Sequence, residues 1–428
     1  MHVVLSTIDP SLENALVDRG QRVLAVIPAA ELANRSDSAR YGLCAVKDWD
    51  DYTRLALLAR ELEPQGIASV STGDECCLRA AAVLRAFLGL PGQSLASAVA
   101  ATDKAVMKRA LAAAGVPVAD NLRAGTPEDI AAAGDALGWP VVAKHRYGFA
   151  TLHTHLVRSR EHLAELHARR AFGPLAGLPA GFAASAVGRG LDRAPGGILV
   201  ERAVPVAAEY HCELLRNESR ELYCLPGRYP APLLGTDDGD GMAPAIGSVL
   251  MDDSDGEEAA RVRELARAAA DALGLVTGFA HVEVLRDTTG AWYLGEIGLR
   301  PGGNMIPHLL RLQHGIDVAA LLADLAQGRP PSIPWRTGRP VAWAAVPAAP
   351  GRRITGVPGA EEISGLPHVT DAIAVVRPGT VVDGPLSSLT AAGHVFCTGA
   401  TPARAAAHAA ETAATWARAI TTEPTAAG

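Results

Sequence analysis

The chain has 428 residues, of which 49% are hydrophobic and 20% charged, an ordinary composition for two or three globular domains with buried cores. A net charge of −7 and an aromatic content of 4% give no sign of a basic or base-stacking face, which argues against a nucleic-acid partner. Its apolar runs are too short to span a membrane, and its first residues lack the pattern of a signal peptide. We therefore expect a cytoplasmic protein that binds neither nucleic acid nor a membrane.

In the first hundred residues, apolar strands alternate with amphipathic helices. The pattern predicts strands at residues 1–6, 22–27 and 65–70, and helices at residues 10–19, 52–62 and 76–88. This order favours a parallel, doubly wound βαβ unit. No GxGxxG loop follows the first strand, so a dinucleotide is not predicted there. Ser71 to Glu75 follows the last strand, where open α/β sheets place ligands, although the same residues would equally serve as a helix N-cap with acids in the first turn.

Two lysines stand at unusual places in the next segment. Thr102 or Asp103 can cap a helix that ends before Gly115, which puts Lys104 in its first turn. A cation is mildly disfavoured at that end of the helix dipole, so Lys104 argues weakly for an anionic partner. After a helix at residues 127–137, the segment WPVVAKHRYG predicts a buried strand that carries Lys144 among apolar residues. Such a lysine usually points to solvent from an edge strand, but its flanking residues favour a strand that delivers charge to a mobile loop.

A later strand carries a series of acids. Residues 175–197 are rich in Gly, Ala and Pro and are expected to have little regular structure. The strand ILVERAV follows, with Glu201 at its exit. In the next strand, AEYHCELL, side chains alternate between the two faces, so Glu209, His211 and Glu213 share one face.

Residues 281–304, HVEVLRDTTGAWYLGEIGLRPGGN, form the most informative stretch of the chain. Period-2 alternation and the turn residues DTTG predict a β-hairpin in which Glu283 lies opposite Glu296, with their Cα atoms about 5 Å apart. Two carboxylates this close repel, so a cation is expected between them, and Mg²⁺ prefers a few carboxylates together with substrate phosphates. If the strand stays extended, Glu296, Gly298 and Arg300 share a face. A surface hairpin with solvated charges is the other interpretation, which the paired acids and the arginine disfavour.

The segments that flank this hairpin are predicted to support it. A loop over residues 225–247 has the length of an active-site cover, and a helix is predicted over residues 257–273. After residue 304 the sequence predicts helices that pack beneath the hairpin. From about residue 330 short strands alternate with Gly-Pro turns and end in an Ala-rich helix at residues 402–419, which predicts a small α+β domain.

The order of these motifs is that of a known superfamily. The chain resembles the ATP-grasp carboxylate–amine ligases and, within them, the bacterial L-amino-acid ligases, over essentially its whole length. The motifs that carry the resemblance are TDK at a helix start, GWPVVAK, ILVE, the pair HVEV and GEIGLR, and GGNMIPHLLRLQHGID. The resemblance implies an α/β protein with the ATP-grasp fold, in which two α+β subdomains grip ATP. It places a Rossmann-like βαβ domain at residues 1–100, the ATP-grasp domain at 101–330 with a lid at about 138–205, and a small α+β domain at 331–428.

The resemblance also implies roles for individual residues, with ATP and Mg²⁺ as cofactors and Mn²⁺ as a second candidate for the metal. Lys104 and Lys144 would contact the ATP phosphates, and Glu283 and Glu296 would hold the metal. Arg300 would stabilise the acyl phosphate and the tetrahedral species formed when an amine attacks it. The adenine would lie against a hinge formed by Glu201, Ala203 and Val204, and Glu209 would lie near the ribose. The acyl-substrate pocket would be formed by Gly302, Gly303 and Asn304.

The activity implied is the ATP-dependent joining of a small carboxylate, expected to be an amino acid, to an amine, with ADP and phosphate as products. The partners implied are these small-molecule substrates and a second copy of the chain in a homodimer. Phosphoryl transfer of this kind needs positioning and charge neutralisation, so no side-chain nucleophile is required. A base for the amine would be useful, and the candidates by residue type alone, each more often structural, are His153, His155, His211, His281 and His308.

Two positions depart from the family pattern. Gly298 stands where members often have an asparagine, which removes one oxygen ligand that water would have to replace. The loop after Lys144, RYGFATLHTH, has one glycine, so its backbone is less free to cradle a phosphate and Arg146 or His153 would compensate. These departures keep open a nucleotide-binding protein without turnover. A biotin-carboxylase-like or purine-pathway ATP-grasp enzyme is a further alternative, although the chain has no Met-Lys-Met carrier segment and the string NMIPHLLRL favours amino-acid ligases.

Overall fold

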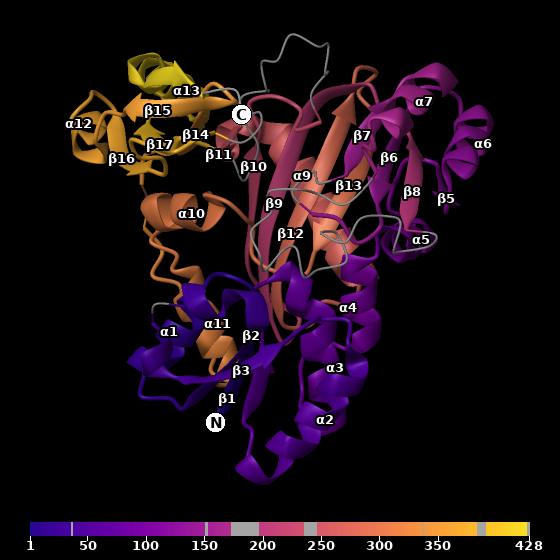
Figure 1. Cartoon of the computed structure of the whole chain (residues 1–428), viewed down its shortest axis with the longest axis vertical. Coiled ribbons are helices and arrows are strands. Elements are labelled where there is room, and N and C mark those ends of the chain that lie inside the picture. Colours follow the sequence, from indigo (N-terminus) through magenta and orange to yellow (C-terminus); the bar gives the residue numbers. More distant parts are fainter. Residues whose placement is uncertain are drawn as a thin grey trace.

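The computed structural model describes residues 1–35, 37–149, 153–172, 197–234, 246–336, 338–382 and 391–425. These residues are of mixed α/β class, as expected, and are organised around two four-stranded sheets and one eight-stranded sheet (Figure 1). The segment 175–197, predicted to be irregular, lies almost entirely outside the described residues. Within the part of the chain that the structure describes, no helix is long and apolar enough to cross a membrane.

The N-terminal unit is a parallel sheet with the strand order β3-β2-β1-β4. Val3 and Leu5 face α2 and α3, whereas Val4 faces α1 and α11, so helices cover both faces of the sheet. This arrangement confirms the predicted parallel βαβ unit. The bounds are β1 His2–Leu5, β2 Val23–Pro28, β3 Gly42–Val46, β4 Ser69–Ser71, α1 Ser11–Asp18, α2 Tyr52–Leu62, α3 Leu78–Leu88, α4 Leu95–Thr102 and α11 Val318–Ala326.

A second sheet, with the strand order β5-β8-β6-β7, is antiparallel and lies at the upper right of Figure 1. The helices α6 and α7 cover one of its faces with apolar side chains such as Ile130 and Leu163. A capping box between Thr126 and Asp129 begins α6. The bounds are α5 Lys104–Ala113, β5 Asn121–Ala124, α6 Pro127–Leu137, β6 Val141–His145, β7 Thr154–Val157, α7 Arg160–Ala168 and β8 Ile198–Arg202.

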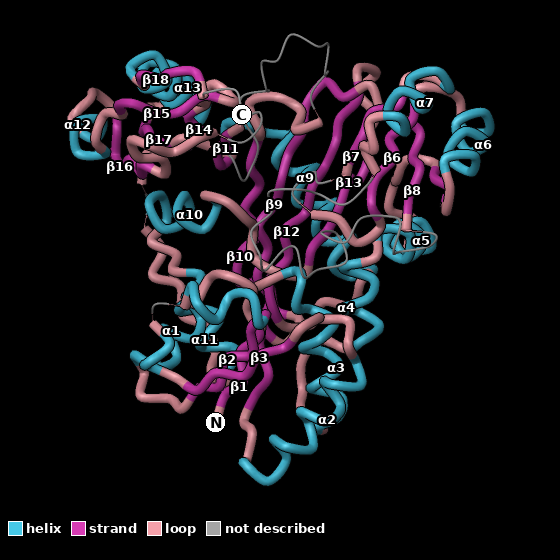
Figure 2. The backbone as a smooth tube through the Cα atoms, viewed as in Figure 1, coloured by secondary structure: helices cyan, strands magenta, loops and turns pink. Residues whose placement is uncertain are grey.

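The eight-stranded sheet has the order β13-β12-β9-β10-β11-β14-β17-β16, and its long strands run side by side through the centre of Figure 2. The helix α9 packs across β9, β10, β12 and β13 and buries Val262, Leu265 and Ala266 against them. The bounds are β9 Val206–Asn217, β10 Arg220–Arg228, β11 Gly247–Leu250, α9 Gly256–Ala272, β12 Gly278–Asp287, β13 Trp292–Gly298, β14 Val341–Val346, β16 Val369–Ala374 and β17 Gly393–Thr398.

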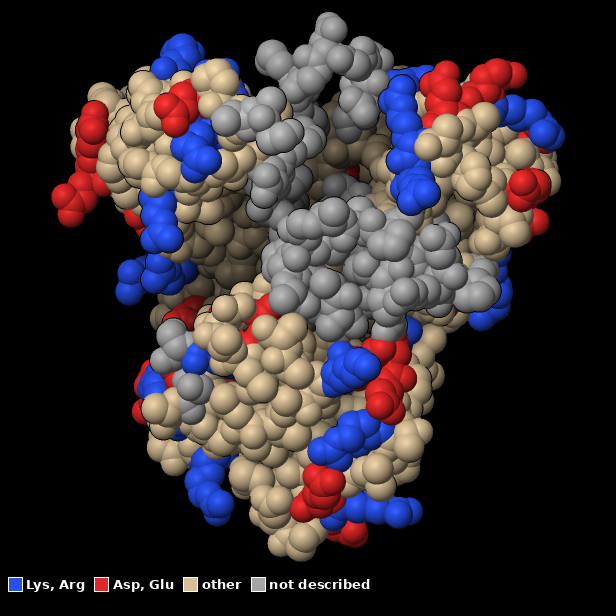
Figure 3. All heavy atoms as spheres, in the orientation of Figure 1, with Lys and Arg blue, Asp and Glu red and all other residues tan. Residues whose placement is uncertain are grey.

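The C-terminal strands β14, β16 and β17 belong to this same sheet, because β14 pairs with β11 and with β17, and β17 pairs with β16. The strands β15 and β18 pair with each other in a separate two-stranded sheet. The predicted Ala-rich helix is α13, which packs on β14 and β17 with Trp416 fully buried. The domain limits expected near residues 100 and 330 stay predictions. The remaining bounds are α10 Ile306–His314, β15 Arg352–Gly356, α12 Ala360–Ser364, α13 Pro402–Ala419 and β18 Thr421–Pro424. Over the face shown in Figure 3, basic and acidic side chains lie interspersed on the N-terminal unit.

Two sequence-based expectations about the fold are wrong in part. The predicted loop over residues 225–247 begins later, because β10 continues to Arg228 and pairs with β9. Pro226 and Gly227 are uncommon within strands, so the sequence pattern did not indicate this one. Gly227 is required there, because a Cβ would lie 2.2 Å from Nε2 of His211. Residues 235–245 of that loop lie outside the described residues. The helix α11 does not pack beneath the hairpin; it packs against α1 and β4 of the N-terminal unit.

Candidate active site

The β12–β13 hairpin holds the two predicted metal glutamates side by side. Glu283 pairs directly with Glu296, which confirms the predicted pair. The register nearer the turn differs from the predicted one by one residue, because Leu285 pairs with Tyr293, and a bulge next to Glu283 brings the two acids opposite each other. Their side chains are 29% and 22% exposed, so neither carboxylate is sealed in the core. Burial raises the pKa of Glu296, and Glu283 adds to this effect although Lys104 opposes it. Burial also acts to raise the pKa of Glu283, but the hydrogen bond and charge of His281 outweigh it and lower that pKa to about 2.

Lys104 reaches this hairpin from the start of α5. Asp103 caps the helix by accepting hydrogen bonds from N–H groups of its first turn. The ammonium of Lys104 lies 2.5 Å from Oε1 of Glu296, and it also donates to the carbonyl of Gly148 in the loop after β6. The anionic partner expected for Lys104 is therefore a carboxylate in this structure, and its contact with phosphate stays a prediction.

Lys144 lies on β6, which is an inner strand between β8 and β7 rather than an edge strand. Its Nζ lies 2.5 Å from Oε2 of Glu201, and Oε1 of Glu201 lies 2.9 Å from Nζ of Lys108. Burial acts to raise the pKa of Glu201, but the two lysines outweigh it and lower that pKa to about 2. Glu201 is thus an ionised, buried carboxylate that two ammonium groups share.

Sequence analysis missed Lys108. It lies four residues after Lys104, so both side chains project from one face of α5, and that spacing was the available signal. The ammonium of Lys108 also donates to the carbonyl of Leu294 in β13 at 2.9 Å. Lys108 therefore connects Glu201 on β8 to the β12–β13 hairpin.

Ala203 and Val204 lie where the chain passes from one sheet to the other. β8 ends at Arg202 in the antiparallel four-stranded sheet, and β9 begins at Val206 in the eight-stranded sheet. The N–H of Ala203 donates to the carbonyl of Pro140 at 3.2 Å. These two residues thus form part of the link between the sheets, and their contact with adenine stays a prediction.

Glu209 is buried on β9 beside Leu285 of β12. Its Oε2 accepts a hydrogen bond of 2.7 Å from the N–H of Leu233. Burial, reinforced by the charge of Glu283, raises the pKa of Glu209 to about 8. Burial and the neighbouring carboxylate thus both favour the protonated form of the carboxyl that is predicted to contact ribose.

Arg300 follows β13 and binds a carboxylate from the N-terminal unit. Its Nε and Nη2 donate to Oε2 of Glu75 at 2.9 and 2.6 Å, and its Nη1 donates to the carbonyl of Pro301 at 2.9 Å. Gly298 lies beneath this pair, since a Cβ there would be 3.5 Å from both Arg300 Nε and Glu75 Oε2. A Cβ at this distance makes an ordinary van der Waals contact, so the structure gives the departure at Gly298 no steric reason.

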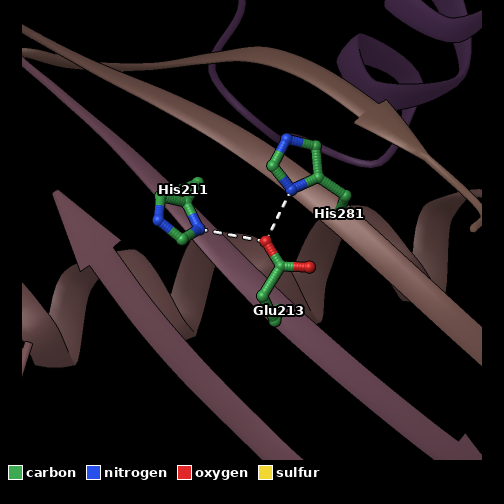
Figure 4. A group of neighbouring side chains, drawn as sticks. All are labelled: His211, Glu213 and His281. Carbon is green, nitrogen blue, oxygen red and sulfur yellow. Dashed lines mark hydrogen bonds and ion pairs between the residues drawn. The ribbon is translucent and has the colours of Figure 1, made fainter. Parts of the chain in front are cut away.

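Glu213 joins three parts of the site. Its Oε1 bonds Nδ1 of His211 at 3.0 Å and Nδ1 of His281 at 2.6 Å, and both rings turn toward it in Figure 4. Its Oε2 accepts from the N–H of Gly302 at 3.0 Å, and Nε2 of His211 bonds the hydroxyl of Ser248. The three side chains carry atom types that bind metals, within 4.8 Å of one another. Because these atoms already bond each other, the group is a hydrogen-bonded network.

The charge state of this network bears on the search for a base. Burial acts to lower the pKa of His281, but Glu213 outweighs it and raises that pKa to about 9. Burial lowers the pKa of His211, which Glu213 only partly offsets. His281 is therefore cationic at neutral pH and unsuited to accept a proton from an amine.

The other candidate bases lie outside this cluster. Nδ1 of His153 and Nε2 of His155 both bond the carbonyl of Ala171, and Nε2 of His308 lies 2.7 Å from Asp371 of β16. The guanidinium of Arg146 donates to Asp103 at the start of α5, and the compensation expected of Arg146 or His153 stays a prediction. Residues 150–152 of the loop after β6 lie outside the described residues.

The three residues of the predicted acyl pocket lie in the loop between β13 and α10. Gly302 is buried against Glu213, and a Cβ there would lie 2.7 Å from Oε2 of that carboxylate. Gly303 and Asn304 are exposed, and Asn304 has a positive φ of 53°. A Cβ at position 302 would therefore require the Glu213 carboxylate to shift. The contact of these three residues with substrate stays a prediction.

Two sequence comparisons find similarity to the L-amino acid ligases. The model of "L-amino acid ligase C-terminal domain 2" matches residues 345–415. The L-arginine-specific L-amino acid ligase of Bacillus subtilis is 28% identical over 290 residues, which cover 67% of this chain and 65% of that relative's length.

Two solved structures are similar over almost the whole chain. The L-amino acid ligase of Bacillus licheniformis superposes with a TM-score of 0.75 at 17% identity, over 99% of this chain and 98% of that one. The biotin carboxylase domain of the 2-oxoglutarate carboxylase of Hydrogenobacter thermophilus, solved with MgADP and bicarbonate, superposes with a TM-score of 0.64 at 14% identity, over 99% and 90%. These likenesses confirm the predicted ATP-grasp fold. With the sequence matches, they show that the chain has the ATP-grasp fold and is similar to the L-amino acid ligases.

Proposed function

We propose that the chain is an ATP-dependent ligase that converts the carboxylate of an amino acid into an acyl phosphate and couples it to an amine. The observation that carries the proposal is the joint placement of Glu283, Glu296 and Lys104. Two carboxylates are paired across a hairpin, and an ammonium lies 2.5 Å from one of them. Such a set suits a metal nucleotide, because it offers anionic ligands to a divalent cation and positive charge to phosphate.

The carboxylate pair fits a magnesium ion. Glu283 and Glu296 are hard oxygen ligands on adjacent strands, and both keep part of their side chains exposed. Mg²⁺ favours one or two carboxylates plus substrate phosphates over an all-protein cage, and Mn²⁺ takes the same oxygen ligands. Bound there, the ion would supply neutralisation of charge on the transferred phosphoryl group.

Lys104 and Lys144 are proposed to hold the phosphates of ATP. Each lies 2.5 Å from a single carboxylate, Glu296 for one and Glu201 for the other. A triphosphate carries more negative charge than one carboxylate and would draw both ammonium groups toward it. The adenosine is proposed to lie against Ala203 and Val204, where the two sheets meet, with Glu209 near the ribose.

Arg300 is proposed to be the catalytic residue for acyl transfer. The attack of an amine on an acyl phosphate places negative charge on the former carbonyl oxygen, and a fixed guanidinium stabilises such charge without reorganising. Glu75 fixes the Arg300 guanidinium through two hydrogen bonds. Gly302, Gly303 and Asn304 are proposed to shape the acyl pocket beside it.

The proposal is tested by measuring phosphate release and product masses with ATP, Mg²⁺ and pools of amino acids. Release that requires a pair of amino acids, with a product of their combined mass less one water, is the expected result. Tight ATP binding with no release in any pool would identify a nucleotide-binding protein without turnover, and release that requires bicarbonate would identify a carboxylase-like reaction.

We also propose that two chains form a homodimer. Light scattering should then give twice the chain mass of 44.3 kDa, and a mass of one chain would contradict it.

A further inference from the structure

We propose that Lys108 is a positioning residue of the nucleotide site, which keeps the buried Glu201 carboxylate neutralised and in place while Lys144 leaves it for the phosphates of ATP. The inference rests on the proposed ATP-dependent function of this site. It adds a residue to which neither the family motifs nor the predicted ligand set gives a role.

The distribution of lysine in the chain first points to this cluster. The chain has 39 basic residues, and only four of them are lysines: Lys47, Lys104, Lys108 and Lys144. Lys47 is exposed, whereas the other three lie on the carboxylates of Glu201 and Glu296. Arginine supplies positive charge almost everywhere else in this chain. Three lysines in one cluster therefore indicate that the cluster needs compact ammonium groups that a planar guanidinium does not replace.

The Glu201 carboxylate contacts two lysines, which differ in how exposed and how tightly held their side chains are. The side chain of Lys108 is 2% exposed and that of Lys144 is 11% exposed. Lys108 is held from two sides, by Glu201 at 2.9 Å and by the carbonyl of Leu294 at 2.9 Å. For Lys144, the Glu201 carboxylate is the one ion-pair partner among the described residues. Lys144 is thus the member of the pair that can leave, and Lys108 the one that stays.

The role proposed for Lys108 follows from the need to neutralise the buried Glu201 carboxylate. Glu201 is buried, and a buried carboxylate that loses its only counter-charge is strongly unfavourable. Without Lys108, Lys144 could pair with either Glu201 or the triphosphate but not with both. ATP binding would then leave the buried Glu201 carboxylate without a counter-charge. With Lys108 in place, Glu201 stays paired when Lys144 turns to the phosphates.

The test is a double-mutant cycle on ATP affinity, measured by calorimetry on the full chain with MgATP. Lys108→Met should raise the Kd for ATP by about tenfold, as expected for residues in one ion-pair network. The same substitution made together with Glu201→Gln should change the Kd by less than about threefold relative to Glu201→Gln alone, because a neutral amide needs no counter-charge. Lys47→Met, on the surface, is the matched control and should bind ATP like the wild type.

Each outcome of the cycle decides the matter. Equal losses with and without Glu201→Gln would show that Lys108 acts through packing, and affinity like that of Lys47→Met would show that it has no role; both overturn the proposal. If Lys108→Met alone does not fold, Glu201→Gln and the double variant still decide, since a tenfold difference between them overturns it. If the wild type binds no ATP, the proposed function and this inference are both overturned. If the wild type binds ATP and Lys108→Met binds it with the same Kd, only the role of Lys108 is overturned.

Discussion

Arg300 donates two hydrogen bonds to a single oxygen of Glu75, a residue 225 positions earlier in the chain. Glu75 begins the short 3₁₀ helix Glu75–Cys77, which Asp74 caps after the last strand of the N-terminal sheet. Of the two interpretations of this segment, the structure shows the helix N-cap, and a ligand contact there stays a prediction. The same turn also brings a carboxylate from the N-terminal unit to the end of the β12–β13 hairpin.

Glu75→Gln should lower kcat by about tenfold and leave the affinity for ATP nearly unchanged, because it loosens the guanidinium of Arg300 without removing a nucleotide contact. Arg300→Ala should abolish product formation while ATP still binds. Steady-state kinetics and ATP titrations measure both effects. Glu61→Gln, which disrupts an exposed pair with Arg54, is the control. A Glu75→Gln enzyme that turns over at the wild-type rate would show that the contact does not position Arg300.

Glu296→Ala should weaken Mg²⁺-dependent ATP binding on the order of 100-fold, because it removes a ligand of the metal. In EDTA the wild type and the variant should bind ATP with the same low affinity. Calorimetry across a series of Mg²⁺ concentrations measures this difference. Glu264→Gln, which changes an exposed acid on α9, should behave like the wild type. An unchanged Mg²⁺ requirement in Glu296→Ala would place the metal elsewhere.

Gly302→Ala and Gly303→Ala form a matched pair. A Cβ at position 302 would lie 2.7 Å from Oε2 of Glu213, which two histidines hold in place, whereas a Cβ at position 303 meets no atom within 4 Å. Gly302→Ala should therefore reduce the free energy of unfolding by about 1–3 kcal/mol and impair turnover, and Gly303→Ala should change stability little. Urea unfolding monitored by circular dichroism compares them. Equal free energies of unfolding for the two variants would mean that the Glu213 side chain can shift to make room for the Cβ at position 302.

Acid should destabilise the protein through His145, which is fully buried on β6. Burial, with the charge of His153 adding to it, lowers the pKa of His145 to about 4 from 6.5, and its Nδ1 accepts a hydrogen bond from the N–H of Tyr147. The folded pKa lies below the unfolded one, so the stability that neutral His145 contributes is present above pH 6.5 and is lost as the pH falls toward 4.

Between pH 7.5 and pH 5 this contribution should fall by about 2 kcal/mol. His145→Asn keeps an acceptor for Tyr147 but does not titrate, so its stability deficit relative to the wild type should shrink by that amount at pH 5. Urea unfolding at the two pH values measures the change, and a constant deficit would contradict the assignment.

The pairing of Glu283 with Glu296 could be predicted from the alternation of two strands and the turn between them, although the bulge next to Glu283, which sets the pair in the folded hairpin, was not predicted. The contacts that complete the site could not, since Lys108 with Glu201 and Glu75 with Arg300 join segments that only the folded chain brings together. The acid and the base of each pair are ordinary in their own segments. Spacing from Lys104 could have singled out Lys108, but nothing local marks Glu75 as the partner of Arg300.

The strand β10 and the continuation of the central sheet show a second kind of limit. Pro226 and Gly227 look like loop residues, yet the strand tolerates them, and the glycine makes room for the ring of His211. The pairing of β14 with β11 depends on the register of strands about a hundred residues apart, which no local pattern specifies. Local periodicity therefore identified the elements better than their partners.

The most direct test of the central claim follows oxygen from the carboxylate substrate to phosphate. An amino acid labelled with ¹⁸O in its carboxylate is incubated with the protein, ATP, Mg²⁺ and an amine, and the released phosphate is analysed by mass spectrometry. An acyl-phosphate mechanism transfers one labelled oxygen to each phosphate when the product forms, which is the result that the account predicts. Product formation with unlabelled phosphate would contradict it.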